Sequence, residues 1–276
     1  MSYLSLNTWS LHRELGPLQW TVWDDIEKKH QIKLEQHPEN IKLKDLPGIL
    51  SSKGFKALEI CHFHFQRTDS SYLEELRNAF NETNITFHTL LVDYGNISSE
   101  DEVRRNKDMQ FIKKWIDIAS EVGAQRVRVI AGDAGPEDSE ALACALNQLN
   151  LLVEYAKPLG VRVVTENFHS LTSKADNCIH LVHQSNQQIR LITDFGNFDS
   201  ETKYDEIVKM LPFSDSIHAK PNFDSDGIPD KEEYQKSLNL LSKTNYNGPI
   251  TLIYDGPGDM WAGIDRVKQI VEAYLV

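Results

Sequence analysis

The sequence predicts a single-domain α/β protein, a (β/α)8 TIM barrel that spans all 276 residues. Strand-like and helix-like segments alternate along the whole chain, which predicts a parallel sheet. Eight such pairs can be counted, and eight pairs predict closure into a barrel. An open doubly wound sheet is the competing architecture, but no glycine-rich phosphate loop follows the first strand.

The first predicted strand covers residues 3–9, where apolar and polar side chains alternate. Residues 10–43 then break the pattern with prolines, tryptophans and many charges, and they are long for a connection between a strand and a helix. We interpret this segment as a lid-like loop insertion in which Trp20 or Trp23 closes over a site. A solvated insertion without such a role is the alternative.

From residue 43 onward the pattern is regular. Gly54 and Gly123 are placed to end two of the helices. The remaining strands are predicted at 56–65, 85–94, 126–132, 161–166, 189–195, 216–220 and 249–254. The helices are predicted at 44–53, 70–80, 98–123, 138–160, 174–184, 201–211, 231–244 and 260–275.

Composition narrows the class of protein. A hydrophobic content of 40% and a charged content of 25% are ordinary for a soluble globular chain. Apolar runs are too short for a membrane span, and the N-terminus lacks the features of a signal peptide. Cys61, Cys144 and Cys178 are far apart, as expected for reduced thiols. A net charge of −12 disfavours nucleic acid, so we expect a cytoplasmic protein without nucleic-acid or membrane partners, and leave a homo-oligomer open.

Ligand-type side chains stand at the ends of three successive strands. Glu166, Asp194 and His218 end the fifth, sixth and seventh strands. Chemistry in such barrels sits where the carboxyl ends of the strands meet, so these groups could converge on one ion. Two carboxylates and an imidazole suit Mn²⁺, Mg²⁺, Co²⁺ or Zn²⁺. The alternative is that the three groups only hydrogen-bond one another at a wet mouth.

Other polar and aromatic groups are predicted at the same mouth. Lys220 shares the strand parity of His218 and would face the site, and Asp133 follows the fourth strand. The side chains expected to contact substrate are His62, His64, His88, Trp20 and Asp255.

Strand parity also directs charged groups into the barrel interior. It turns Arg126 and Arg128 of the fourth strand inward, together with Glu59 and Cys61 of the second. Alternate strands share a layer of side chains, so Glu59 and Arg128 could form a buried structural ion pair. A substrate anchor is the other interpretation of this pair.

The motifs TENFH, TDFGN and IHAK, in this order, resemble the divalent-metal site of the xylose isomerase-like TIM barrels. That superfamily includes sugar-phosphate isomerases and epimerases, ketohexose 3-epimerases, hydroxypyruvate isomerase, inosose dehydratase and endonuclease IV. The resemblance covers the whole chain, from LNTWSL through GFKALEI to the last strand. It implies that Glu166, Asp194 and His218 are the metal ligands.

The last strand departs from the family pattern. The epimerase-type members carry a fourth ligand there, a Glu, and the aligned position in GPITLIYDG is Ile253. The resemblance then implies that a two-base epimerisation has lost one of its partners. Asp255 lies two residues farther along, about 6.5 Å at roughly 3.3 Å per residue. It could ligate the metal directly, reach it through water, or contact substrate.

The expected function is that of a divalent-metal-dependent sugar or sugar-phosphate isomerase or epimerase-like enzyme. It would act on a small polyhydroxy carbonyl compound through an enediolate. Glu166 or His169 would move the proton, and Lys220 would neutralise developing charge. A dehydratase or lyase of the same superfamily and a non-catalytic sugar-binding barrel are the alternatives. An endonuclease IV-like nuclease is disfavoured, since Asn197 stands where a further His is expected and the net charge is acidic.

Two loops resemble ligand-binding motifs less closely. Residues 222–233 nearly fit a calcium loop, but Asn222 replaces the first Asp and a strand leads in, so a plain turn explains them. Residues 254–259 could approach a phosphate with backbone amides, although acidic flanks favour a turn there too.

Overall fold

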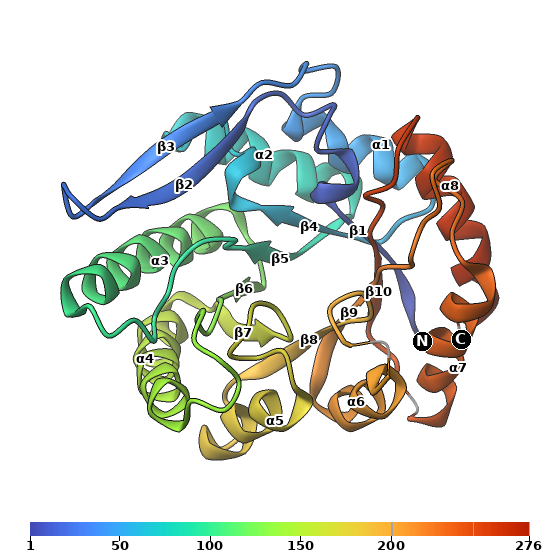
Figure 1. Cartoon of the computed structure of the whole chain (residues 1–276). Coiled ribbons are helices and arrows are strands. Elements are labelled where there is room, and N and C mark those ends of the chain that lie inside the picture. Colours follow the sequence, from blue (N-terminus) through green and yellow to red (C-terminus); the bar gives the residue numbers. More distant parts are fainter. Residues whose placement is uncertain (200, 245, 276) are drawn as a thin grey trace.

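The computed structural model describes residues 1–199, 201–244 and 246–275. Eight parallel strands form a closed barrel in the order β1-β10-β9-β8-β7-β6-β5-β4 (Figure 1). The predicted (β/α)8 fold is confirmed. The barrel strands are β1 (Tyr3–Asn7), β4 (Ala57–Cys61), β5 (Thr86–Leu91), β6 (Arg126–Arg128), β7 (Arg162–Glu166), β8 (Arg190–Asp194), β9 (Ser214–Ala219) and β10 (Pro249–Leu252).

Within the described residues, eight α-helices surround these strands (Figure 1). None of those in the described part of the chain is long and apolar enough to cross a membrane. They are α1 (Leu46–Ser52), α2 (Ser70–Thr83), α3 (Glu102–Val122), α4 (Ser139–Ala156), α5 (Ala175–Gln184), α6 (Lys203–Met210), α7 (Lys231–Lys243) and α8 (Met260–Val271).

Aspartate side chains set the start of several helices. Asp101 accepts hydrogen bonds from the backbone N–H groups of Val103 and Arg104, so α3 begins at Glu102 and not at residue 98 as predicted. At the other end of α3, Gly123 adopts a φ of 79°, which confirms its predicted role in ending the helix. The same aspartate cap opens α2, α4, α7 and α8, at Asp69, Asp138, Asp230 and Asp259.

Side chains fill the interior of the barrel, so the mouth is a cavity that is closed at its bottom and is not a pore. The inner cluster consists of Leu18, Cys61, Phe63, Leu91, Val164 and Ile192. Trp9 and Trp20 pack against it from the mouth side. A separate, larger core fills the space between the strands and the helices. Side chains that end the strands therefore stand above a packed interior, in which this apolar cluster lies beside buried polar groups such as Glu59 and His88.

The insertion predicted at residues 10–43 contains a β-hairpin, with loops on either side of it. β2 (Leu18–Asp24) and β3 (Lys29–Glu35) pair antiparallel over their whole length. Neither strand was predicted, because tryptophans and charged residues obscure the alternation of polar and apolar side chains. The hairpin runs beside α3 (Figure 1), where His30 Nε2 lies 2.8 Å from Asp108 Oδ1. The insertion is thus an ordered element fixed to the barrel wall.

Candidate metal centre

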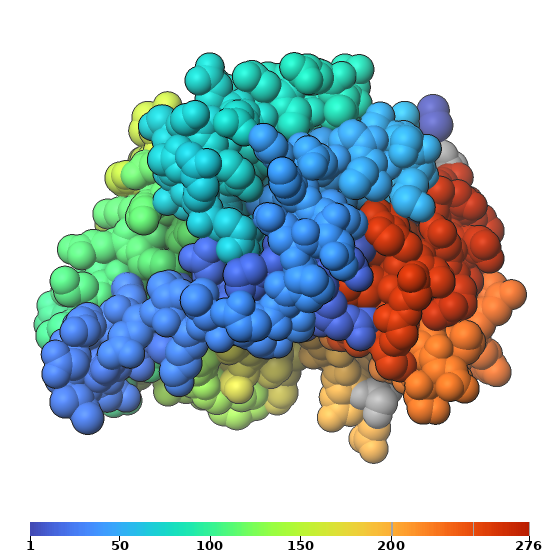
Figure 2. Space-filling model, turned by 90° about the horizontal axis from the view of Figure 1, so that it is seen from above, coloured from blue at the N-terminus to red at the C-terminus, as the bar shows by residue number. Residues whose placement is uncertain are grey.

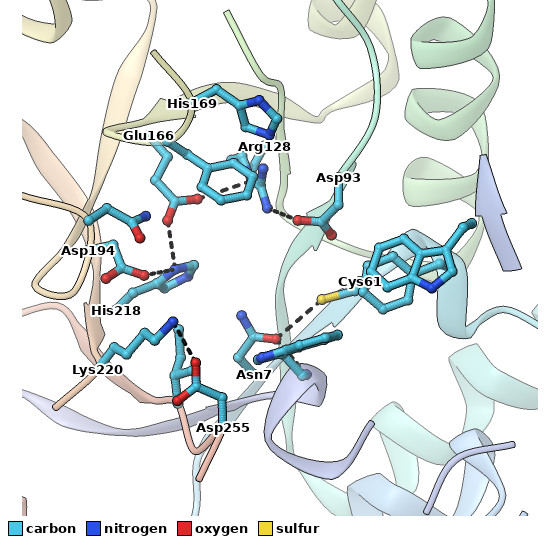
Figure 3. Close-up of a pocket in the computed structure, with 16 residues that line it drawn as sticks. Asn7, Cys61, Asp93, Arg128, Glu166, His169, Asp194, His218, Lys220 and Asp255 are labelled. Carbon is cyan, nitrogen blue, oxygen red and sulfur yellow. Dashed lines mark hydrogen bonds and ion pairs between the residues drawn. The ribbon is translucent and has the colours of Figure 1, made fainter. Parts of the chain in front are cut away.

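The three predicted ligands meet at the carboxyl ends of β7, β8 and β9. Glu166, Asp194 and His218 are buried, and each offers a ligand atom that lies within 4.8 Å of the other two. His218 Nδ1 is 3.1 Å from Glu166 Oε1 and 3.7 Å from Asp194 Oδ2 (Figure 3). Three adjacent parallel strands end at one edge, so a single residue from each is enough to build this cluster.

Glu59 fixes the orientation of the His218 ring. Its Oε2 lies 2.6 Å from His218 Nε2, on the side of the ring that faces away from Glu166. Ser216 donates to Glu59 Oε1 at 2.7 Å, and His88 Nδ1 lies 3.1 Å from the same oxygen. A carboxylate bound to one ring nitrogen holds a histidine in place and directs the other nitrogen to a metal.

The predicted pair between Glu59 and Arg128 is wrong. Arg128 is in register with Leu91, and Leu91 with Cys61, which lies two residues beyond Glu59 toward the mouth. Arg128 Nη2 instead donates to Asp93 Oδ1, and its Nε lies 3.2 Å from Glu166 Oε2. Arg128 points to the inside as predicted, but it lies in the layer of Cys61, two residues closer to the mouth than Glu59.

Asn167 holds two of the strand ends together. Its Nδ2 donates to the backbone oxygen of Asp194 at 2.9 Å, and its Oδ1 accepts from the backbone N–H of Asp194 at 2.7 Å. Both hydrogen bonds are buried. The Asn of the TEN motif therefore fixes Asp194 relative to the neighbouring Glu166.

The carboxylates of the cluster are stabilised by positive charge. Burial would lower the pKa of His218, but Glu166 and Glu59 raise it well above its ordinary value. Burial would likewise raise the pKa of Glu166, yet His218 and Arg128 hold it below its ordinary value. The cluster thus stabilises ionised carboxylates next to a positive charge, which a proton or a divalent ion can provide.

The donor set fits a divalent metal ion. Glu166 Oε2 is buried and has no hydrogen-bond partner among the described residues, because the N–H of Arg128 Nε does not point at it. This orphan oxygen lies on the Arg128 side of the carboxylate, and Oε1 is the oxygen that faces His218. Two carboxylates and one imidazole suit Mg²⁺, Mn²⁺, Co²⁺ or Zn²⁺.

The cluster opens into a cavity of about 470 Å³ at the mouth of the barrel. Figure 3 shows Glu166, Asp194 and His218 on one wall and Asn7 and Cys61 on the opposite one. Apolar and aromatic groups complete the lining, namely Trp9, Trp20, Phe63, Phe168 and Ile253. A cavity of this size and composition accommodates a small molecule.

Lys220 and Asp255 stand together at the rim of this cavity. Lys220 Nζ lies 2.6 Å from Asp255 Oδ2, and both residues line the cavity (Figure 3). Ile253 lies just beyond the end of β10 and also faces the cavity. Asp255 is thus committed to Lys220 and is not part of the ligand cluster among the described residues.

Three histidines expected to contact substrate lie outside the cavity lining. His62 and His64 belong to the short 3-10 helix η3 (His62–His64), which ends the strand predicted to reach residue 65. His62 Nδ1 accepts from the backbone N–H of Asp93 at 3.1 Å, and His64 Nδ1 lies 2.8 Å from Thr8 Oγ1. His88 is buried beneath the site on Glu59. Burial lowers the pKa of His62 to about 4, as expected for a neutral structural histidine.

The three residues of interest in the insertion and in the loop after β7 differ in position. Trp20 lines the cavity, and its indole Nε1 donates to Glu35 Oε2 at 2.9 Å. Trp23 lies elsewhere, with its Nε1 on Asp25 at 3.0 Å. His169 lines the cavity at a φ of 64°, a strained conformation for a side chain of its size, and its Nδ1 lies 2.6 Å from Asp133 Oδ1.

Several lining residues were not identified from the sequence as site residues. Among them, Asn7 ends β1, Trp9 lies in the following 3-10 helix η1 (Thr8–Leu11), Phe63 lies in η3, and Asp93 follows β5. Asn7 and Asp93 each follow a barrel strand, so the rule that picked Glu166 and Asp194 could have found them. Asp93 matters most, because it binds the guanidinium that also contacts Glu166.

The two weaker loop motifs behave as turns. Asp224 accepts from the backbone N–H groups of Asp226 and Ile228, and Asp230 caps α7, so their carboxylates already serve the backbone. In the loop after β10, the carbonyls of Gly256 and Gly258 face Arg13 at 3.1 and 3.0 Å. These hydrogen bonds hold the loop as a turn, and phosphate binding there stays a prediction.

Comparison with known proteins supports the same kind of fold. The family model for the xylose isomerase-like TIM barrel matches residues 48–273. An L-ribulose 3-epimerase structure shares 14% identity at a TM-score of 0.73, covering 100% of this chain and 95% of that one. The structure of the probable 3-DHS dehydratase AsbF from Bacillus anthracis shares 16% identity at a TM-score of 0.70, covering 99% of each chain.

A third structure is similar and carries a metal in its description. It is a xylose isomerase-like TIM barrel protein from Mycobacterium smegmatis in complex with magnesium, with 16% identity, a TM-score of 0.68, and coverage of 99% of this chain and 97% of that one. No match was found among curated protein sequences. At these identities the structural similarity establishes the shared fold.

Proposed function

The chain belongs to the xylose isomerase-like TIM barrel family, and from this premise we propose a divalent-metal-dependent isomerase or epimerase-like enzyme. Its substrate would be a small polyhydroxy carbonyl compound, a sugar or sugar phosphate, and its intermediate an enediolate. The observation that carries the proposal is the buried cluster of Glu166, Asp194 and His218, whose ligand atoms lie within 4.8 Å of one another. The epimerase and dehydratase activities named for similar structures are consistent with it.

Glu166, Asp194 and His218 would hold the ion, with Glu59 keeping the His218 ring in place. A bound divalent ion would supply Lewis-acid stabilisation of the negative charge that develops on the substrate oxygen. Lys220 at the rim would add a second positive charge for a substrate oxygen or carboxylate, in exchange for its present contact with Asp255.

The proton chemistry would rest on Glu166 and His169. Glu166 would take the proton from the carbon next to the carbonyl, and the released electron pair would form the carbon–carbon double bond of the enediolate. His169, held through Nδ1 by Asp133, would present Nε2 to the cavity as a second proton carrier. Arg128 would keep Glu166 ionised before the transfer.

Ile253 restricts which reaction this arrangement favours. It occupies the part of the lining contributed by the last barrel strand, where the epimerase-type relatives in the resemblance carry a Glu. An apolar side chain cannot exchange a proton, so the two faces of a bound substrate would differ. One-base isomerisation, or elimination of water as in a dehydratase, is therefore favoured over epimerisation between two carboxylates.

Trp20 supports a closing role for the hairpin. It reaches the cavity from β2 and packs on Phe63 with ring centroids 4.4 Å apart. We propose that β2 and β3 form the lid that was expected from the insertion, and that Trp20 covers the substrate.

Metal analysis followed by isotope exchange tests the proposal. Purified protein incubated with Mn²⁺, Mg²⁺, Co²⁺ or Zn²⁺ should retain about one ion per chain. It should also incorporate solvent deuterium into at least one member of a ketose and hydroxy-acid panel. Glu166→Gln should retain ion but lose exchange, because the amide oxygen can still ligate and cannot accept the proton.

Each outcome separates the alternatives. Absence of stoichiometric metal and of any thermal shift would overturn the metalloenzyme proposal. Metal retention and sugar binding without exchange would favour the non-catalytic sugar-binding barrel. Exchange that survives in Glu166→Gln would move the base to another group, with His169→Gln as the next variant.

A further inference from the structure

The outer edge of the hairpin is an uncovered strand. β3 pairs only with β2 among the described residues, and six of its seven residues are exposed. Two of these are large and apolar, Ile32 at 54% exposure and Leu34 at 59%. Figure 2 shows the hairpin lying open along one rim of the molecule. Proteins usually cover or shorten such an edge, because its free backbone groups can pair with another chain.

The edge is complementary to itself. Side chains alternate along β3, so Ile32 and Leu34 share one face of the strand, and Lys29, Lys33 and Glu35 share the other. When KHQIKLE is laid antiparallel on a second KHQIKLE with Ile32 at the centre, Lys29 stands opposite Glu35 at both ends. Ile32 stands opposite Ile32 between them. No two like charges face each other directly in this register.

We propose that two copies of this chain associate through β3, with a two-fold axis at Ile32. The two hairpins would then form one four-stranded antiparallel sheet across the interface. Main-chain hydrogen bonds along the edge would supply affinity, and the paired charges would fix the register. The same patch serves both partners, as a two-fold interface requires.

A second copy fits this edge better than an unrelated strand does. An arbitrary peptide would satisfy the backbone groups but would match the lysine at one end and the glutamate at the other only by chance. Lys29 and Glu35 are both open to a partner, with side-chain exposures of 58% and 54%. Their contacts within the chain lie at the surface, to Glu27 and to His37.

This interface would reach the cavity through one residue. Glu35 Oε2 accepts the hydrogen bond from the indole of Trp20, which lines the cavity. The partner's Lys29 would therefore bind the carboxylate that positions Trp20. Association of two chains would steady the aromatic wall of each cavity, whatever substrate it binds.

Charge reversal tests the register on the full-length protein. Sedimentation or light scattering should show a dimer for the wild type at tens of micromolar. Lys29→Glu alone and Glu35→Lys alone should each raise the dissociation constant about tenfold or more, since symmetry repeats every like-charge pair twice. The double variant Lys29→Glu, Glu35→Lys should return to the dimer.

Mixing the two single variants gives the sharpest outcome. Lys29→Glu carries two acids and Glu35→Lys two bases, so an equimolar mixture should form a heterodimer. Lys56→Glu, an exposed reversal outside β3, is the matched control and should stay dimeric. A monomeric wild type would overturn the proposal. A dimer that tolerates both single reversals would also overturn it, because the contact would then lie elsewhere.

Discussion

The two ends of the barrel treat charge in opposite ways. At the amino ends of the strands, Asp215 accepts from Arg126 Nε at 2.9 Å, from Arg162 Nη1 at 2.8 Å and from Arg190 Nε at 3.1 Å. At the carboxyl ends, Glu166 keeps an orphan oxygen next to Arg128, whose Nη1 and Nε also lack hydrogen-bond partners among the described residues.

The difference separates a structural cluster from a functional one. Around Asp215 the acid is fully paired within the chain, so nothing further is needed to complete it. Around Glu166 buried donors and acceptors remain, although the site could have been closed with the same residue types. We therefore expect stability to depend on the first end and ligand binding on the second, in line with the general division between the two faces of such barrels.

Asp194→Asn at the mouth should have the largest effect. Loss of a ligand carboxylate should lower metal-dependent deuterium exchange by roughly 10³-fold, the scale for removing a group that stabilises transition-state charge. The free energy of unfolding of the metal-free protein should stay the same or rise, since one of several crowded negative charges is gone. Exchange rates and urea unfolding measure the two effects. A variant that unfolds readily would contradict the division between the ends.

Asp215→Asn at the opposite end should reverse that pattern. It should lower the free energy of unfolding by about 2 kcal/mol, because three arginines lose their shared partner at a half-buried site. Exchange per folded molecule should not change. Asp176→Asn, an exposed acid bound to Lys209, is the matched control and should cost less than about 0.5 kcal/mol. Equal losses in urea unfolding would remove the contrast.

Glu59→Gln probes the support beneath the metal site. The amide cannot replace the carboxylate that orders the His218 ring, so metal affinity should fall about 10- to 100-fold. Competition titration with a chelator of known affinity measures this. Unchanged affinity would show that His218 is positioned by Glu166 and Asp194 alone.

The smallest effect concerns pH. Burial would raise the pKa of Asp215, but its arginine partners hold it below its ordinary value of 3.8. A depressed pKa contributes stability above the ordinary value, and that contribution is lost as pH falls through the folded-state pKa. The stability difference between wild type and Asp215→Asn should therefore be constant near neutrality and shrink below about pH 4. A stability difference that grows as the pH falls would contradict a lowered pKa of Asp215.

Local patterns predicted the strand ends well and the contacts between strands less well. Glu166, Asp194 and His218 could be placed because each ends a strand, and parallel strands end at one edge. The partner of Arg128 could not be placed, because it depends on the register between β5 and β6 and on an irregularity at Leu58 and Glu59. A shift of one pleat changes every contact along the ladder.

The predictions for the histidines and for the hairpin strands failed at different points of the sequence pattern. His62 and His64 leave the strand through a 3-10 turn that points them into the protein, and no residue in CHFHF signals this turn. The hairpin strands have seven residues each, but tryptophans and charges obscure the alternation of their side chains, and tertiary contacts such as His30 on Asp108 hold them in place. Tertiary packing therefore decided both outcomes.

The double hydrogen bond of Asn167 has a consequence for the choice of ion. It couples the ends of β7 and β8, so we expect Glu166 and Asp194 to keep a constant separation when they move. An ion of larger radius would then require His218 on β9 to move away from the two carboxylates. That ring rests on Glu59, so we expect the contact between Glu59 and His218, and not the carboxylate ligands, to set the range of ion radii that the site accepts.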